Sequence, residues 1–179
     1  PELDKKKLKA LSKRRDLPAL IHFFFYFLFL FASGYLAYVT IGTWWTYLFF
    51  FMYGTIYAFS VANWHETVHR TAFKTRWINE FFYHISSFMC DFDGFRWRWS
   101  HTFHHSNTLQ TEDDYDHEIQ VSRPVELFAF FLNYLPLTDL LFPHKLIKYE
   151  VIKHSLGFFS PVINITAPPK EKKKILWNS

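Results

Sequence analysis

The chain separates into a long uncharged stretch and charged flanks. Residues 17–64 contain no Asp, Glu, Lys or Arg, whereas residues 1–16 are strongly basic. A helix needs about 20 apolar residues to cross a bilayer, so a stretch of this length is sufficient for two crossings. We predict membrane spans at 17–39 and 44–62, joined by a short turn around Gly42. Aromatic residues follow this turn at 44–47, as is favoured at a membrane–water boundary.

Beyond the second span the pattern predicts short helices. Residues 77–89 predict a buried or interfacial helix of about three turns, which is too short to cross a bilayer. Asp93-Gly94 predicts a turn before a basic aromatic stretch. Pro124 predicts a helix start, and Pro136 a kink in it. The sequence shows no strand alternation of useful length. We therefore predict an all-α integral membrane fold, with a transmembrane hairpin followed by interfacial helices. The expected segments of a single domain, 1–179, are a basic N-terminus at 1–16, the hairpin at 17–62, a histidine-rich region at 63–123, interfacial helices at 124–157 and a loop or tail at 158–179.

Composition and charge narrow the function classes. Aromatic residues make up 22% of the chain, and Cys90 is its single cysteine, which excludes a disulfide-stapled scaffold. The net charge of +4 comes mainly from two basic blocks beside apolar segments. This placement favours an anionic lipid surface over nucleic acid as the partner. The basic N-terminus predicts a cytoplasmic location for itself and, after two crossings, for the region that follows residue 63.

Five of the 10 histidines gather in two short motifs. The first cluster is His65 and His69 in HETVH, and the second cluster is His101, His104 and His105 in HTFHH. Residues three and four apart share one face of a helix, so each cluster can direct its rings at one centre. Imidazole binds iron, zinc and copper, and five ligands exceed the needs of one tetrahedral metal. The pattern therefore favours two metals, or one metal of higher coordination. We interpret the isolated His22, His84, His144 and His154 as structural.

The first cluster also fits a second interpretation. HETVH matches the HExxH motif of zinc proteases, in which two histidines bind zinc and the glutamate activates water. Glu66 would then be the general base, and a third ligand would come from elsewhere in the chain. The second cluster would be left largely without a role. A membrane zinc metalloprotease therefore remains an alternative.

The two motifs together resemble those of the membrane fatty acid desaturase and hydroxylase superfamily. HETVH and HTFHH are separated by 31 residues and follow a membrane hairpin. Their surroundings, HETVHRTAFKTRWIN and FRWRWSHTFHHSNTLQTEDDYD, are also similar to the family's first two histidine boxes, and the likeness covers roughly residues 17–123. The family's third box, HxxHH, is absent. We therefore expect the sequence to be an N-terminal fragment of such a protein that holds only part of the ligand set and is inactive alone.

The resemblance implies a non-haem di-iron centre on the cytoplasmic face, held by the first and second clusters. It implies a reaction in which O2 and two external electrons serve to introduce a double bond or a hydroxyl group into a fatty acyl or related lipid chain. The electrons would come from a separate donor of the ferredoxin or cytochrome b5 type. Four further residues could support the metal ligands, either by a hydrogen bond that orients a ring or, for His117, as an accessory ligand: Glu66, Asp113, Asp116 and His117. A metal-free, non-enzymatic homologue is a further alternative.

Overall fold

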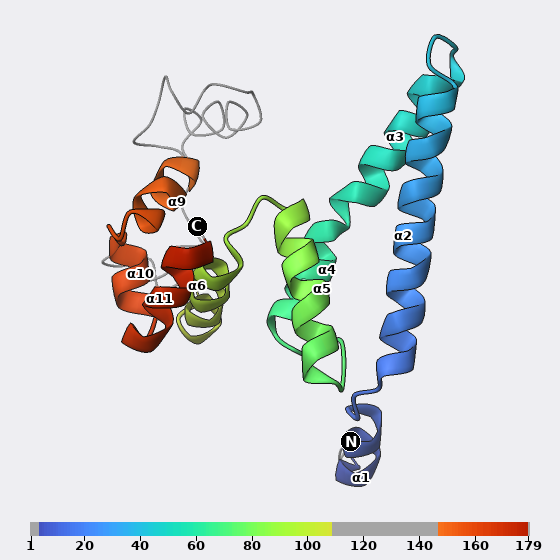
Figure 1. Cartoon of the computed structure of the whole chain (residues 1–179). Coiled ribbons are helices and arrows are strands. Elements are labelled where there is room, and N and C mark those ends of the chain that lie inside the picture. Colours follow the sequence, from blue (N-terminus) through green and yellow to red (C-terminus); the bar gives the residue numbers. More distant parts are fainter. Residues whose placement is uncertain (1–3, 109–146, 179) are drawn as a thin grey trace. The chain divides into compact units, whose positions relative to one another are not determined.

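The computed structural model describes residues 4–108 and 147–178, and in this part of the chain every regular element is a helix (Figure 1). The all-α prediction is therefore confirmed for these residues. The chain divides into two compact units, residues 1–91 and residues 92–179. The kinked helix predicted at 124–142 lies outside the described residues, as do Asp113, Asp116 and His117.

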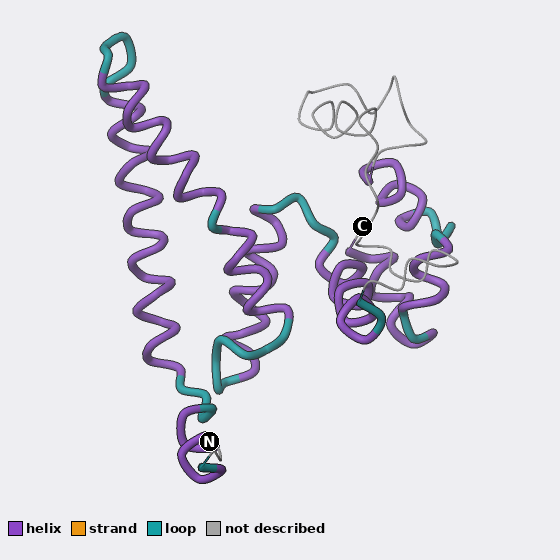
Figure 2. Tube along the Cα trace, turned by 180° about the vertical axis from the view of Figure 1, so that it is seen from behind, coloured by secondary structure: helices purple, strands orange, loops and turns teal. Residues whose placement is uncertain are grey.

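The first unit is built on a helical hairpin. After a short basic helix, α1 (Lys5–Leu11), come α2 (Asp16–Val39) and α3 (Trp45–Ala58), which run side by side (Figures 1 and 2). Two segments are long and apolar enough to cross a membrane, Asp16–Val39 and Trp45–Val68. Each has 24 residues, and at about 1.5 Å per residue such a helix exceeds the ~30 Å hydrocarbon thickness. Both predicted spans are thus helical as expected.

Two glycines shape the hairpin. Gly42 lies in the turn with φ of 89°, a backbone conformation that a side chain disfavours. Gly34 lies against α3, since a Cβ atom built there would be 3.1 Å from the ring of Tyr53. Hydroxyl groups of the turn close its backbone, with Thr40 Oγ1 donating to the Leu36 carbonyl at 2.7 Å. A small residue therefore permits the tight packing of α2 on α3.

The second span continues further than the sequence predicts. A single tight turn at Phe59 separates α3 from α4 (Ser60–Val68), so the helical path extends past the predicted end at residue 62. The next helix, α5 (Arg76–Met89), agrees with the predicted helix at 77–89 and packs on α4. Small or polar residues are buried along both helices: Ser60, Asn63, Thr67, Asn79, Ser86 and Ser87.

The second unit contains α6 (Gly94–Ser106), α9 (Ile147–Ser155), α10 (Pro161–Thr166) and α11 (Pro169–Asn178). Helices α10 and α11 both pack against α6. The core of the unit is formed by three fully or nearly fully buried residues, Ile163, Ala167 and Ile175. Aromatic side chains cover this core, namely Phe95, Trp99 and Phe159.

Two predictions in the second unit are corrected. The expected turn at Asp93-Gly94 is a helix start, where the Asp93 carboxylate accepts hydrogen bonds from the Phe95 and Arg96 amides at 3.0 and 3.2 Å. The expected loop after Gly157 contains α10 and α11. Pro161 and Pro169 are the first residues of these helices, where a missing N–H costs nothing. Both prolines therefore begin helices within the segment that was expected to be a loop or tail.

Candidate metal-binding site

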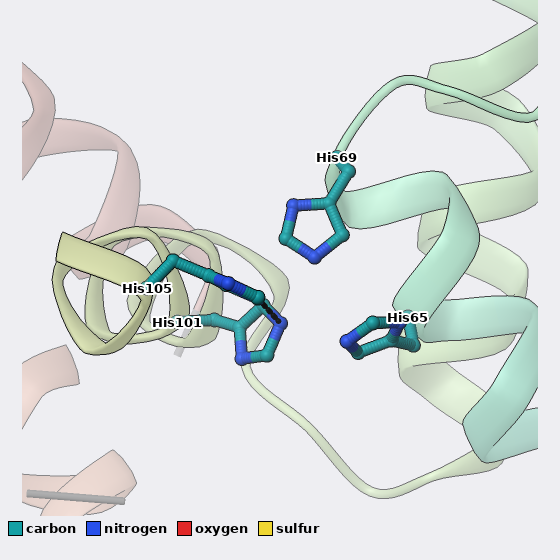
Figure 3. Close-up of side chains that lie close together, drawn as sticks. All are labelled: His65, His69, His101 and His105. Atoms are coloured by element: carbon teal, nitrogen blue, oxygen red, sulfur yellow. Dashed lines mark hydrogen bonds between the residues drawn. The ribbon is translucent and has the colours of Figure 1, made fainter. Parts of the chain in front are cut away.

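The first cluster lies at the C-terminal end of α4. His65 is in the last turn, and His69 is the residue that ends the helix. Their ring centroids are 4.8 Å apart with the planes nearly perpendicular, at 77°. The possible ligand nitrogens of the two rings lie within 4.8 Å of one another (Figure 3). The spacing of four residues thus brings both imidazoles to one side of the helix, as the sequence predicts.

The second cluster lies on α6. The rings of His101 and His105 have centroids 4.7 Å apart, and their Nε2 atoms form a hydrogen bond of 3.2 Å, drawn as a dashed line in Figure 3. The ring of His104 lies 5.8 Å from that of His101 and 5.5 Å from that of His105. All three imidazoles of the second cluster are therefore neighbours on one helix.

Hydrogen bonds at both ends of α6 determine the position of this cluster. Asp93 caps the N-terminus and so fixes where the helix begins, eight residues before His101. This start sets the rotational phase of each later residue, because a helix turns about 100° per residue. His104 and His105 occupy the last turn, where Asn107 and Thr108 hydrogen bond back to the helix. The local sequence thus determines the face on which the histidines gather.

The donor chemistry of each cluster fits a metal ion. In the His101–His105 hydrogen bond one ring donates a proton and the other accepts it, so at least one ring is positioned as a neutral donor of a lone pair. Replacement of the shared proton by a cation would use nitrogen atoms that already converge. Nitrogen donors of this kind suit iron, zinc and copper. Within each unit, the residues present could therefore contribute ligands to such an ion.

Glu66 is mostly exposed and lies beside His65. Its side chain is 66% exposed, and its Oε1 lies 3.9 Å from His65 Nδ1, beyond hydrogen-bond distance. Thr71 Oγ1 donates to the Glu66 carbonyl at 2.9 Å and approaches its carboxylate at 3.5 Å. No hydrogen bond between Glu66 and His65 therefore supports the predicted role of Glu66 in orienting a ligand ring.

Two of the isolated histidines have structural partners. His22 Nε2 and Asn63 Oδ1 are 2.8 Å apart and link α2 to α4. His154 is fully buried in the second unit and accepts a hydrogen bond from the Ser160 amide at 3.2 Å. His84 is exposed on α5, and His144 and His117 lie outside the described residues. These contacts agree with the structural interpretation of His22 and His154.

Cys90 does not resemble a metal ligand. Its thiol is 3.4 Å from the hydroxyl oxygen of Ser60, and burial raises the pKa of the thiol above its ordinary value. A thiol with a raised pKa remains protonated at neutral pH, and the protonated form is a poor ligand. Among the described residues, the histidines therefore dominate the possible metal chemistry.

Sequence reasoning missed the side chains that support the first cluster. Asn79 is fully buried, and its Nδ2 donates to the Thr67 carbonyl at 2.6 Å, between the two histidines of that cluster. Arg70, which directly follows His69, forms an ion pair with Glu80. The only signal available in the sequence was the position of Asn79 in the RWIN segment that follows the first motif.

Comparison with known proteins places the chain in a family. The sequence model described as Fatty acid desaturase matches residues 42–177, which include both histidine clusters. No curated protein and no solved structure matches the chain. The match extends over most of the residues and includes the second span as well as the helices of the second unit. The chain therefore belongs to the fatty acid desaturase family.

Proposed function

We propose that the chain functions in a membrane-bound, O2-dependent oxidoreductase that introduces a double bond, or a hydroxyl group, into a fatty acyl chain. Membership of the desaturase family supports lipid chemistry of this general kind. The two candidate membrane spans support a substrate that resides in or at a bilayer. Desaturation is the preferred reaction, and hydroxylation is the variant that the same histidine pattern serves.

The observation that carries the proposal is the convergence of imidazoles within each cluster. We propose that His65 and His69 join His101, His104 and His105 in holding two iron ions, with O2 as co-substrate. Bound iron would supply the redox chemistry for attack on an unactivated C–H bond, which no side chain can provide. The imidazoles hold and orient the metal through neutral nitrogens, with ring spacings of 4.7 and 4.8 Å in the two closest pairs. Asp113, Asp116 and His117 stay as proposed supporting residues.

Basic and aromatic residues support the proposed lipid partners. The lysines of α1 and α11 support a cytoplasmic location at an anionic leaflet. A pocket of about 290 Å³ on the second unit is lined by Phe95, Lys173, Lys174 and Trp177, a combination suited to lipid headgroups. Because a single cysteine cannot hold an iron–sulfur cluster, we propose a separate electron donor of the ferredoxin or cytochrome b5 type.

Metal analysis of the purified protein tests the proposal. We expect iron, with little zinc, and a loss of bound iron when any histidine of the two clusters is changed to alanine. His84→Ala is the matched control, because His84 is exposed on α5 and belongs to neither cluster. Analysis of lipids from cells that express the protein should then show new double bonds or hydroxyl groups.

The alternatives make different predictions. A zinc protease would bind zinc through the first cluster, and His104→Ala would have a mild effect on its metal content. A non-enzymatic homologue would be well folded without bound metal. Either result would overturn the di-iron proposal.

A further inference from the structure

The segment that follows the first cluster contacts the neighbouring helices at several residues. Residues 70–75, here called the 70–75 loop, connect the end of α4 to α5. The first residue of the loop, Arg70, has φ of 58°, in the left-handed region that a non-glycine residue rarely occupies. Such a conformation costs free energy and persists only where surrounding contacts enforce it. Since Arg70 directly follows His69, its backbone determines how the chain leaves the first cluster.

Arg70 is held by a short ion pair. Its Nε donates to Glu80 Oε1 at 2.6 Å, across ten residues and onto the first turns of α5. The two side chains are 40% and 26% exposed, so the pair is partly shielded from solvent. Charge-assisted hydrogen bonds of this length are stronger than those between neutral groups. The pair therefore ties the strained residue to the neighbouring helix.

The far end of the 70–75 loop is equally well fixed. Phe73 is 1% exposed, and its ring lies 5.2 Å from that of Phe82 and 5.5 Å from that of Phe23. The backbone N–H and the hydroxyl group of Thr75 donate to the two carboxylate oxygens of Asp16 at 2.8 and 2.7 Å. The loop thus has contacts to both α2 and α5, and its path is determined along its length.

A second contact from α5 reaches the end of α4 itself. The Asn79 side chain donates from Nδ2 to the carbonyl of Thr67 at 2.6 Å. The same carbonyl also accepts from the Arg70 N–H at 3.0 Å, so the buried amide adds a second hydrogen bond at the end of the helix. This turn carries His65 and leads into His69. Neighbouring residues of α5, Asn79 and Glu80, therefore hold the backbone on both sides of His69.

We propose that Glu80, through Arg70, and Asn79 are positioning residues that fix the orientation of the His69 ring for metal binding. The inference rests on the proposed metal site and explains how the backbone around His69 is kept rigid. Productive metal geometry tolerates displacements of roughly 0.5 Å or 10–20°. Release of Arg70 from Glu80 would allow its φ to relax, which would swing the adjacent His69 away from that geometry.

The test is a titration of the metal-free chain in detergent with Co²⁺, monitored by the visible absorption of the bound ion. We expect Glu80→Gln and Asn79→Leu each to weaken Co²⁺ affinity about 10- to 100-fold, as changes in groups that support metal ligands typically do. Glu171→Gln is the control, since it removes the acid of the Lys174–Glu171 ion pair in the second unit. This control should bind Co²⁺ within about twofold of the unchanged protein.

A double-variant comparison separates positioning from general destabilisation. If Glu80 acts through Arg70, the Arg70→Lys and Glu80→Gln variants together should bind Co²⁺ no more weakly than the weaker of the two single variants. Helix content by circular dichroism verifies folding, and Arg70→Lys, which retains the charge, serves if Glu80→Gln does not fold. Wild-type-like affinity in folded Glu80→Gln and Arg70→Lys proteins would refute the positioning role. Unchanged Co²⁺ binding by His69→Ala would instead refute the metal site on which the inference rests.

Discussion

Ile163 provides a direct test of the core described for the second unit. Its side chain is 0% exposed and packs with Ala167 and Ile175 beneath aromatic side chains. Ile163→Ala removes three carbon atoms and leaves a cavity, a change that costs 2–5 kcal/mol in well-packed cores. Complete burial supports a cost of about 3 kcal/mol, which corresponds to a change of roughly a hundredfold in an opening equilibrium.

Hydrogen exchange of the whole chain of residues 1–179 in detergent measures this cost. Amides of peptides that cover residues 161–178 should exchange roughly a hundredfold faster in the Ile163→Ala protein. Ile165→Ala is the matched control, because Ile165 is on the same helix, loses the same atoms and is 58% exposed. We expect the control to change the opening free energy by less than about 0.5 kcal/mol. Equal exchange rates in the two variants would refute the assigned core.

Three further predictions follow from local geometry. Gly34→Ala should lower the thermal midpoint in detergent because the new methyl group meets Tyr53 at 3.1 Å, whereas Gly54→Ala, which has open space, should keep or raise it. Cys90 should react slowly with iodoacetamide at pH 7 and faster as the pH rises, because burial raises the pKa of its thiol; rapid labelling of the folded protein at pH 7 would contradict its burial. Asp93→Ala should destabilise the start of α6 by about 1 kcal/mol through loss of the helix cap, and Asp93→Ser should restore most of this stability, as measured by exchange of the α6 amides.

The sequence was most informative where one local property determined the structure. The absence of charge in residues 17–64 predicted the hairpin, and spacings of three and four residues predicted that each histidine cluster shares a helix face. Both features depend on helix periodicity and on transfer of side chains from water, which act locally. The end of the second span was predicted too early, because Asn63 and the residues after it are polar. In the structure Asn63 is hydrogen bonded to His22 on α2, and the Thr67 carbonyl accepts a hydrogen bond from Asn79 on α5, so these residues form part of the helix–helix contacts.

The contacts that support the first cluster could not be predicted, because they join residues far apart in the chain. Asp16 and Thr75 are 59 residues apart, and His22 and Asn63 are 41 residues apart. No periodic pattern identifies such partners before the hairpin and α5 are in place. The left-handed conformation of Arg70 was equally hidden, since glycine is the residue that normally signals it.

The near-continuity of α3 and α4 has a consequence for which changes in chain length the protein can accept. A residue inserted between Phe59 and His65 would shift the first cluster by about 1.5 Å along the helix axis and rotate it by about 100°. The same insertion in the turn around Gly42 would leave the helix beyond it intact, because this turn lies outside both helices. Length variation among natural relatives should therefore be tolerated in the turn and selected against in the five residues between Phe59 and His65. This segment sets both the depth and the direction of the imidazoles of the first cluster.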